Sequence, residues 1–104
     1  MKTAQDQAEE YAVSDVTVIL STPLARFAGG ETKFTVPAGT FQEVIGEVYE
    51  RHPALRVRVA DGAGALLPFV SVYVGEDNIR DLGSFDVEVA PSSTVMIMSA
   101  VAGG

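Results

Sequence analysis

One short segment constrains the fold more than any other, because it carries both a helical repeat of apolar residues and the signals that start and stop a helix. Its apolar side chains recur at the spacing of a single helix face, at Phe41, Val44, Ile45, Val48 and Tyr49. Thr40 followed by Glu43 makes a capping box, in which the hydroxyl and the carboxylate each bind a backbone N–H that the helix leaves unpaired. Pro53 cannot continue a helix. The segment therefore predicts a helix from about Thr40 to Arg51 with one face buried.

Segments on both sides of this helix have the patterns of strands. Residues 16–20 have the two-residue period of a strand with one apolar face, and the same period resumes at 32–36 after the turn signal Gly29-Gly30. We therefore expect a hairpin of these two strands. Further strands are expected at 69–74, which is rich in β-branched and aromatic residues, and at 94–98.

The segments between these strands are expected to be less regular. The stretch after Pro53 that contains Leu55 and Val57 is expected to form a loop, although Arg56 and Arg58 alternate and could share one strand face. Residues 79–82 follow a turn of glycine and acidic residues, and we expect them to form a short edge piece of the sheet. The expected order is strand, strand, helix, strand, edge piece, strand.

Length and charge limit the class of protein. A chain of 104 residues corresponds to one domain with its own core. We expect this domain at residues 16–98, between a flexible N-terminal tail at 1–15 and an extended C-terminal tail at 99–104. The net charge of −7 argues against nucleic acid as a partner. No apolar run resembles a membrane span or a signal peptide, so we expect a cytoplasmic protein that binds no membrane.

Few side chains in the sequence suit catalysis or metal binding. There is no cysteine, and His52 is the only histidine, which argues against a zinc site and against Cys/His or Ser-His-Asp catalysis. His52 stands at the expected end of the helix, where an imidazole favours the helix dipole. The acidic residues Glu76, Asp77 and Asp81 lack the spacing of a calcium loop. We therefore expect no metal site and no enzymatic activity.

The end of the sequence places two glycines directly after the last expected strand, in Ala100–Gly104 (AVAGG). Glycines let a carboxylate pass through a channel too narrow for side chains. With this end, with FVSVYVGEDNIRDLG at 69–83, and with Phe27–Gly30 followed by an acidic residue, the chain resembles the ubiquitin-like sulfur-carrier family over residues 16–104. That family includes thiamin-thiazole carriers, molybdopterin-synthase small subunits and cysteine-biosynthesis carriers. The resemblance implies an α+β fold of the β-grasp (ubiquitin-like) class, with a mixed sheet packed on one main helix.

The resemblance also implies a function. In the family, an adenylating enzyme of the ubiquitin-activating type uses MgATP to activate the terminal carboxylate, and a sulfur donor then converts it into a thiocarboxylate. A sulfur-accepting synthase consumes that sulfur in cofactor, cysteine or specialised-metabolite biosynthesis. On this sequence Gly104 would carry the sulfur, while Gly103 and Ala102 would lengthen the tail and keep it narrow. The chain would bind no cofactor itself, would be a monomer when free, and would be a co-substrate rather than a catalyst.

A docking surface is expected on the face of the sheet that points away from the helix. Strand alternation places Ile19, Met96 and Met98 on that face. Because the first and last strands are neighbours in the family's fold, we expect these residues to form an apolar patch near the tail, together with Phe69 and Tyr73. A charged residue at position 19 or 96 would then impair adenylation. The alternative is that the two methionines only pair across strands or lie under a loop.

Other functions are compatible with the same features. A ubiquitin-like modifier would join Gly104 to a lysine of a target protein, although with only Lys2 and Lys33 the chain offers few sites for building chains on itself. The small subunit of a molybdopterin synthase would keep its tail threaded in a large subunit. A binding module of the same fold would have an inert tail. The sequence leaves the sulfur acceptor open.

Overall fold

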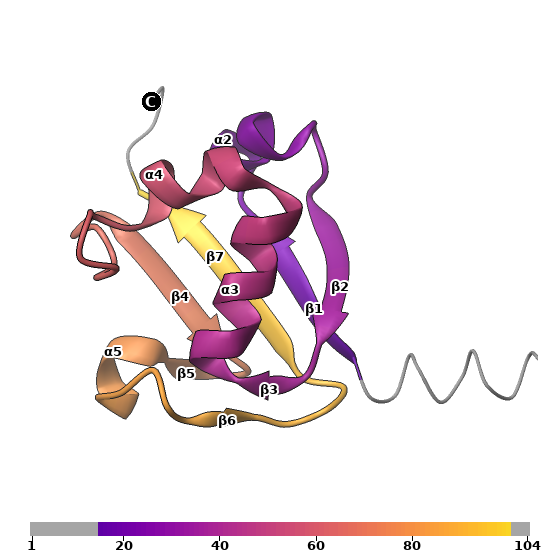
Figure 1. Cartoon of the computed structure of the whole chain (residues 1–104), viewed down its shortest axis with the longest axis vertical. Helices are drawn as coiled ribbons and strands as arrows, with labels where there is room; N and C mark the ends of the chain where they lie inside the picture. Colours follow the sequence, from indigo (N-terminus) through magenta and orange to yellow (C-terminus); the bar gives the residue numbers. More distant parts are fainter. Residues whose placement is uncertain (1–14, 101–104) are drawn as a thin grey trace, which may run out of the picture.

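The computed structural model describes residues 15–100, and its main feature is one mixed sheet packed on a single long helix. The five strands of this sheet lie in the order β2-β1-β7-β4-β5, with bounds β2 Lys33–Pro37, β1 Asp15–Leu20, β7 Thr94–Ser99, β4 Val70–Val74 and β5 Asp77–Asn78. β1 and β7 are parallel neighbours, and the other pairs are antiparallel. Figure 1 shows helix α3, Phe41–Arg51, lying across one face of the sheet. The predicted α+β architecture is confirmed.

The predicted helix forms with the predicted cap. The backbone N–H of Glu43 donates to the Thr40 hydroxyl oxygen at 3.2 Å, and the Thr40 N–H donates to the Glu43 carboxylate at 2.9 Å. The helix ends at His52, whose backbone leaves the helical region just before Pro53. The apolar face of α3 is buried against the sheet at Phe41, Val44, Ile45 and Val48.

Alternation along β1 decides which side chains reach this core. Val16, Val18 and Leu20 are buried, whereas the residues between them are partly exposed. On the parallel neighbour β7, Val95 and Ile97 are fully buried on the same side. Strands β1 and β7 therefore present one face to α3 and leave the other face accessible, as the sequence predicts.

The first two strands pair antiparallel as expected, but their connection is more than a glycine turn. It contains helix α2, Thr22–Ala25, and the 3₁₀ helix η1, Arg26–Ala28. Gly29 and Gly30 then follow with φ of 64° and 86°, values that glycine adopts without strain. The connection buries Leu24 in the core, so it adds to the packed structure.

The expectation of an edge piece at residues 79–82 was wrong. These residues form the short helix α5, Ile79–Leu82, because the Asn78 side chain accepts a hydrogen bond from the Arg80 N–H at 2.9 Å and caps the first turn. Gly83, with φ of 78°, ends the helix. The edge strand of the main sheet is instead β5, which pairs with β4.

The expectation of a loop, or of a strand face with Arg56 and Arg58, in the stretch that contains Leu55 and Val57 was also wrong. The 3₁₀ helix η2, Pro53–Leu55, leads directly into helix α4, Arg56–Val59. Leu55 and Val59 are fully buried and fix this segment on the core. A second, two-stranded sheet also escaped prediction, formed by β3, Gly39–Thr40, and β6, Glu88–Val89.

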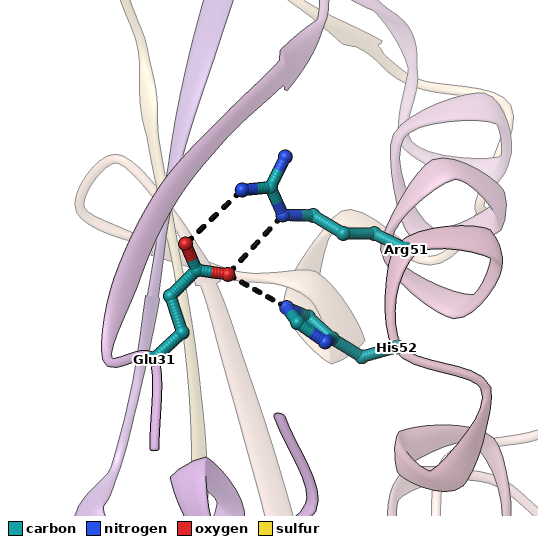
Figure 2. A network of polar contacts seen from close by, with 3 residues as sticks. All are labelled: Glu31, Arg51 and His52. Carbon is teal, nitrogen blue, oxygen red and sulfur yellow. Dashed lines mark hydrogen bonds and ion pairs between the residues drawn. The ribbon is translucent and has the colours of Figure 1, made fainter. Parts of the chain in front are cut away.

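A polar network ties the start of β2 to the end of α3 (Figure 2). Glu31 accepts hydrogen bonds from Arg51 Nε at 3.2 Å and Arg51 Nη2 at 3.0 Å, and its Oε1 lies 2.8 Å from His52 Nε2. Phe34 lies under the same group, with its ring centroid 5.0 Å from the Arg51 guanidinium carbon and 5.1 Å from the His52 ring. The hydrogen bonds from Arg51 and His52 lower the pKa of the Glu31 carboxyl, and the bond to Glu31 raises the pKa of Arg51. His52 thus pairs with a carboxylate here.

Among residues 15–100 no helix has the length and apolar character that crossing a membrane requires. The same residues contain no group of three or more His, Cys, Asp or Glu side chains placed to hold a metal ion.

Candidate functional site

Three of the residues expected in the docking patch form one row across the sheet. Ile19 of β1 is the register partner of Met96 in β7, and Met96 is in turn the partner of Tyr73 in β4. All three are partly exposed, whereas Val18 and Val95 beside them are buried on the helix side. The row is therefore an apolar surface on the face opposite α3.

Met98 lies one row nearer the tail. Its register partner in β4 is Ser71, and it is partly exposed on the same face as Met96. At this end of the sheet the Ser99 N–H donates to the Ser21 hydroxyl oxygen at 3.3 Å. The structure therefore brings together four of the five predicted patch residues: Ile19, Tyr73, Met96 and Met98.

Phe69 has a different position. It lies in a tight turn in which the Val70 N–H donates to the Leu67 carbonyl at 3.0 Å, so it precedes the regular alternation of β4. Phe69 is 40% exposed and lines a groove at Ser99 and Ala100, where the tail begins. We call these two residues the tail root, and the groove lies on the helix side of it. Phe69 thus borders a second surface, which the sequence analysis did not identify.

The tail root is held by the same turn. The Ala100 N–H donates to the Phe69 carbonyl at 2.9 Å, which extends the pairing of β7 one residue beyond its end. The turn itself is fixed by Arg80, whose guanidinium donates to the Val70 carbonyl at 2.6 Å and to the Leu67 carbonyl at 2.8 Å. Arg80 therefore positions the backbone from which the tail leaves.

The groove at the tail root lies between α2, η1, α4 and the turn that contains Phe69. It has a volume of about 120 Å³ and is lined mainly by Leu24, Phe27, Val57, Arg58, Leu67 and Phe69, with Ser99 at its edge. Arg58 stacks over the Phe27 ring, with its guanidinium carbon 4.2 Å from the ring centroid. Figure 1 shows α2 and α4 lying at the tip of β7. Pro53 at the first position of η2 is the one local signal that predicts a helical turn here.

The predicted sulfur-carrying residue Gly104 and the tail residues Ala102 and Gly103 lie outside the described residues. What the structure shows is their point of attachment, at the end of a central strand between the row on one face and the groove on the other. Neither surface carries a pair of acidic side chains or a histidine. In the described part of the chain, both surfaces are formed mainly by apolar side chains.

Comparisons with known proteins agree with this geometry. No family model matches the chain. Sulfur carrier protein CysO of Mycobacterium bovis is 30% identical over 92 residues, which cover 86% of this chain and 99% of that protein. The solved BexX/CysO complex of Amycolatopsis orientalis contains a chain 35% identical to this one, with a TM-score of 0.75 and coverage of 86% and 99%.

The crystal structure of Mycobacterium tuberculosis CysO matches with a TM-score of 0.74 and 28% identity, over 83% of this chain and 99% of that one. The similarity therefore extends over the sheet, the helix and nearly the full length of each relative. This chain belongs to the ubiquitin-like sulfur-carrier family, and its function is that of a sulfur carrier.

Proposed function

We propose that the sulfur is carried on the terminal carboxyl group of Gly104 as a thiocarboxylate, after a partner enzyme has adenylated that group with MgATP. The observation that carries this proposal is the similarity to CysO sulfur carriers over nearly their whole length, combined with the glycine pair Gly103-Gly104 shortly after a central strand. The acceptor is an enzyme of cofactor, cysteine or specialised-metabolite biosynthesis.

The chemistry explains why a partner is needed. A carboxylate delocalises its charge, and with an α-carboxyl pKa of about 3.5 it is ionised at neutral pH and is a poor electrophile. In the first step, an oxygen of Gly104 attacks the α-phosphorus of MgATP and pyrophosphate leaves. In the second step, hydrosulfide attacks the acyl carbon and AMP leaves, and the thiocarboxylic acid loses its proton. In the delivery step the thiocarboxylate sulfur displaces a leaving group from the acceptor and forms an acyl–sulfur bond to it. Water then cleaves that bond, which leaves the sulfur on the acceptor and returns the Gly104 carboxylate.

In these steps the chain holds the start of the tail in a fixed position. The tail leaves a strand that is hydrogen-bonded on both sides, and its root is fixed by the Phe69 carbonyl and by Arg80. The reacting carboxyl group belongs to this chain, whereas the catalytic side chains and MgATP belong to the partner, so the chain acts as a co-substrate with no resident cofactor. We place this cycle in the cytoplasm, with the free carrier monomeric.

The apolar row of Ile19, Met96 and Tyr73, with Met98 beside it, is the proposed docking face for the adenylating enzyme. Its position next to the tail root supports this assignment, since the proposed sulfur-carrying Gly104 stands four residues after Ala100 and lies at most about 14 Å from it. Methionine side chains adapt to partners of different shape, which suits a carrier that is loaded by one enzyme and unloaded by another. CysO of Amycolatopsis orientalis was solved in complex with BexX, so a relative of this kind binds another protein.

Intact mass spectrometry tests the proposal. The chain is incubated with MgATP, sodium hydrosulfide and an adenylating enzyme of the ubiquitin-activating type, and the expected product gains the mass difference between sulfur and oxygen at Gly104. The matched control lacks Gly103 and Gly104 and is expected to keep its mass. An unchanged wild-type mass with an enzyme that loads its own carrier would contradict the proposal.

Two other results would favour the alternative functions. Conjugation to a protein lysine would give a covalent adduct of the two chains in place of the sulfur shift. A stable complex with a large subunit would indicate the molybdopterin-synthase arrangement. The curated relatives with significant similarity are sulfur carriers, which favours the thiocarboxylate.

A further inference from the structure

The groove at the tail root carries apolar surface that the fold of residues 15–100 leaves uncovered. Val57 is 73% exposed, the largest value among the large apolar side chains of this part of the chain, and Phe69 at 40% is the next. Both border the same groove. A second hollow adjoins the first and shares Val57 and Leu67, so Val57 stands as a ridge between two hollows. Apolar surface concentrated in this way is typical of interaction sites.

Arg58 gives this groove a specific polar group. Its guanidinium lies over the Phe27 ring, with its carbon 4.2 Å from the ring centroid, and its N–H groups donate to no acceptor within residues 15–100. A guanidinium that is oriented by stacking retains its planar fork for a carboxylate, to which it can donate two parallel hydrogen bonds. The groove therefore presents an apolar floor beside an oriented cation, on a chain whose net charge is −7.

The groove also adjoins the point where the tail begins, since Phe69 and Ser99 both line it. The carbonyl of Phe69, which lines the groove, accepts from the Ala100 N–H, and the proposed sulfur-carrying Gly104 stands four residues after Ala100 in the sequence. An extended segment of that length spans at most about 14 Å. An enzyme that brings Gly104 into its catalytic centre must therefore approach the tail root closely, and the groove lies on the helix side of that root.

We propose that this groove is a second docking site for the adenylating enzyme, filled by an apolar side chain of the enzyme that adjoins an aspartate or glutamate paired with Arg58. The inference rests on the proposed function and adds a contact on the helix side, distinct from the row of Ile19, Met96 and Tyr73 on the opposite face. The two contacts together would grip the carrier on both sides of the strand that bears the tail.

The test uses the full chain and the enzyme that gives the sulfur shift with wild type. Val57→Asp places a carboxylate on the ridge, and Leu82→Asp is the matched control because Leu82 is also exposed, at 38%. Figure 1 shows α5, which contains Leu82, at the end of the molecule opposite α4. ATP–pyrophosphate exchange gives KM and kcat for each carrier, and circular dichroism checks that each variant folds.

We expect Val57→Asp to raise KM for the carrier at least tenfold with kcat within about twofold of wild type, while Leu82→Asp changes neither by more than about twofold. Arg58→Gln is expected to raise KM about fivefold and to weaken the dependence of KM on salt, because a charge pair is lost. A folded Val57→Asp chain with the wild-type KM would overturn the inference and leave the proposed function standing.

Other occupants of the groove give different results. Nuclear Overhauser effects between Val101 and the Phe27 or Phe69 ring in the free chain would assign the groove to the chain's own tail and overturn the inference. A dimer in light scattering that Val57→Asp dissociates would assign it to a second copy and also overturn it. A wild-type chain that cannot be adenylated would refute the proposed function, and this inference with it.

Discussion

Replacing Arg80 by methionine is expected to destabilise the turn that holds the tail root, although Arg80 is exposed. The substitution removes two hydrogen bonds, at 2.6 Å to the Val70 carbonyl and at 2.8 Å to the Leu67 carbonyl. A hydrogen bond from a charged group contributes about 1.5–3 kcal/mol, and partial exposure of Arg80 reduces this, so we expect a loss of about 1–2 kcal/mol in the free energy of unfolding. Urea unfolding followed by circular dichroism measures that loss.

The informative measurement is local. Because the turn held by Arg80 supplies the Phe69 carbonyl to the Ala100 N–H, amide hydrogen exchange at Ala100 should be faster in Arg80→Met by a larger factor than the change in global stability explains. Arg26→Met is the control, since Arg26 is exposed and its side chain makes no hydrogen bond within the described part of the chain. If Ala100 exchanged equally fast in Arg80→Met and wild type, the proposed coupling between Arg80 and the tail root would be refuted.

Three further predictions concern the cap, the docking face and the polar network. Thr40→Ala removes the hydroxyl that caps α3 at 3.2 Å and should cost about 1 kcal/mol in urea unfolding, and an unchanged midpoint would contradict the assigned cap. Met96→Asp should raise the KM for the carrier in pyrophosphate exchange. Because Met96 is partly exposed, the substitution should lower the free energy of unfolding by no more than about 1 kcal/mol. A KM equal to that of wild type would exclude the row as the docking face. Because the pKa of the Glu31 carboxyl is lower in the folded chain than its ordinary value of 4.5, ionised Glu31 stabilises the fold at pH above 4.5. This contribution to the free energy of unfolding is lost as the pH falls through the lower pKa of the folded state. Glu31→Gln should therefore show a weaker loss of stability in acid than wild type, and parallel curves of stability against pH would refute this assignment.

Local signals in the sequence predicted the elements whose determinants are local. The helix α3 has its start encoded by Thr40 and Glu43 and its end by Pro53, all within one segment, and the structure confirms it. The inward positions of Val18 and Val95 follow from the two-residue period of a strand. The pairing of β1 with β7, which brings Ile19 beside Met96, joins segments far apart in the chain, and it followed only from the resemblance to the family.

The short elements could not be predicted by periodicity. Helix α4 and helix α5 have four residues each, fewer than the repeat needs to separate a helix from a strand. Arg56 and Arg58 alternate as they would on a strand, yet Leu55 and Val59, four residues apart, are the pair that reaches the core. The two-residue strands β3 and β6 pair through tertiary contact alone.

The groove was missed for the same reason. Its floor and walls come from four separate segments, including α2, α4 and the turn before β4, and only their packing brings Phe27, Val57 and Phe69 together. The turn also moves Phe69 out of the alternation that the sequence pattern suggested for 69–74. The composition of each segment, taken alone, contains no sign of this surface.

The attachment of the tail to a central strand has a mechanical consequence. An enzyme that draws the carboxyl end into its catalytic centre, or releases it afterwards, exerts force along β7. That strand is bonded to β1 on one side and β4 on the other, and these bonds run across the direction of pull. Tension at the tail is therefore shared by many bonds in shear, so the domain resists unravelling through repeated rounds of loading and delivery.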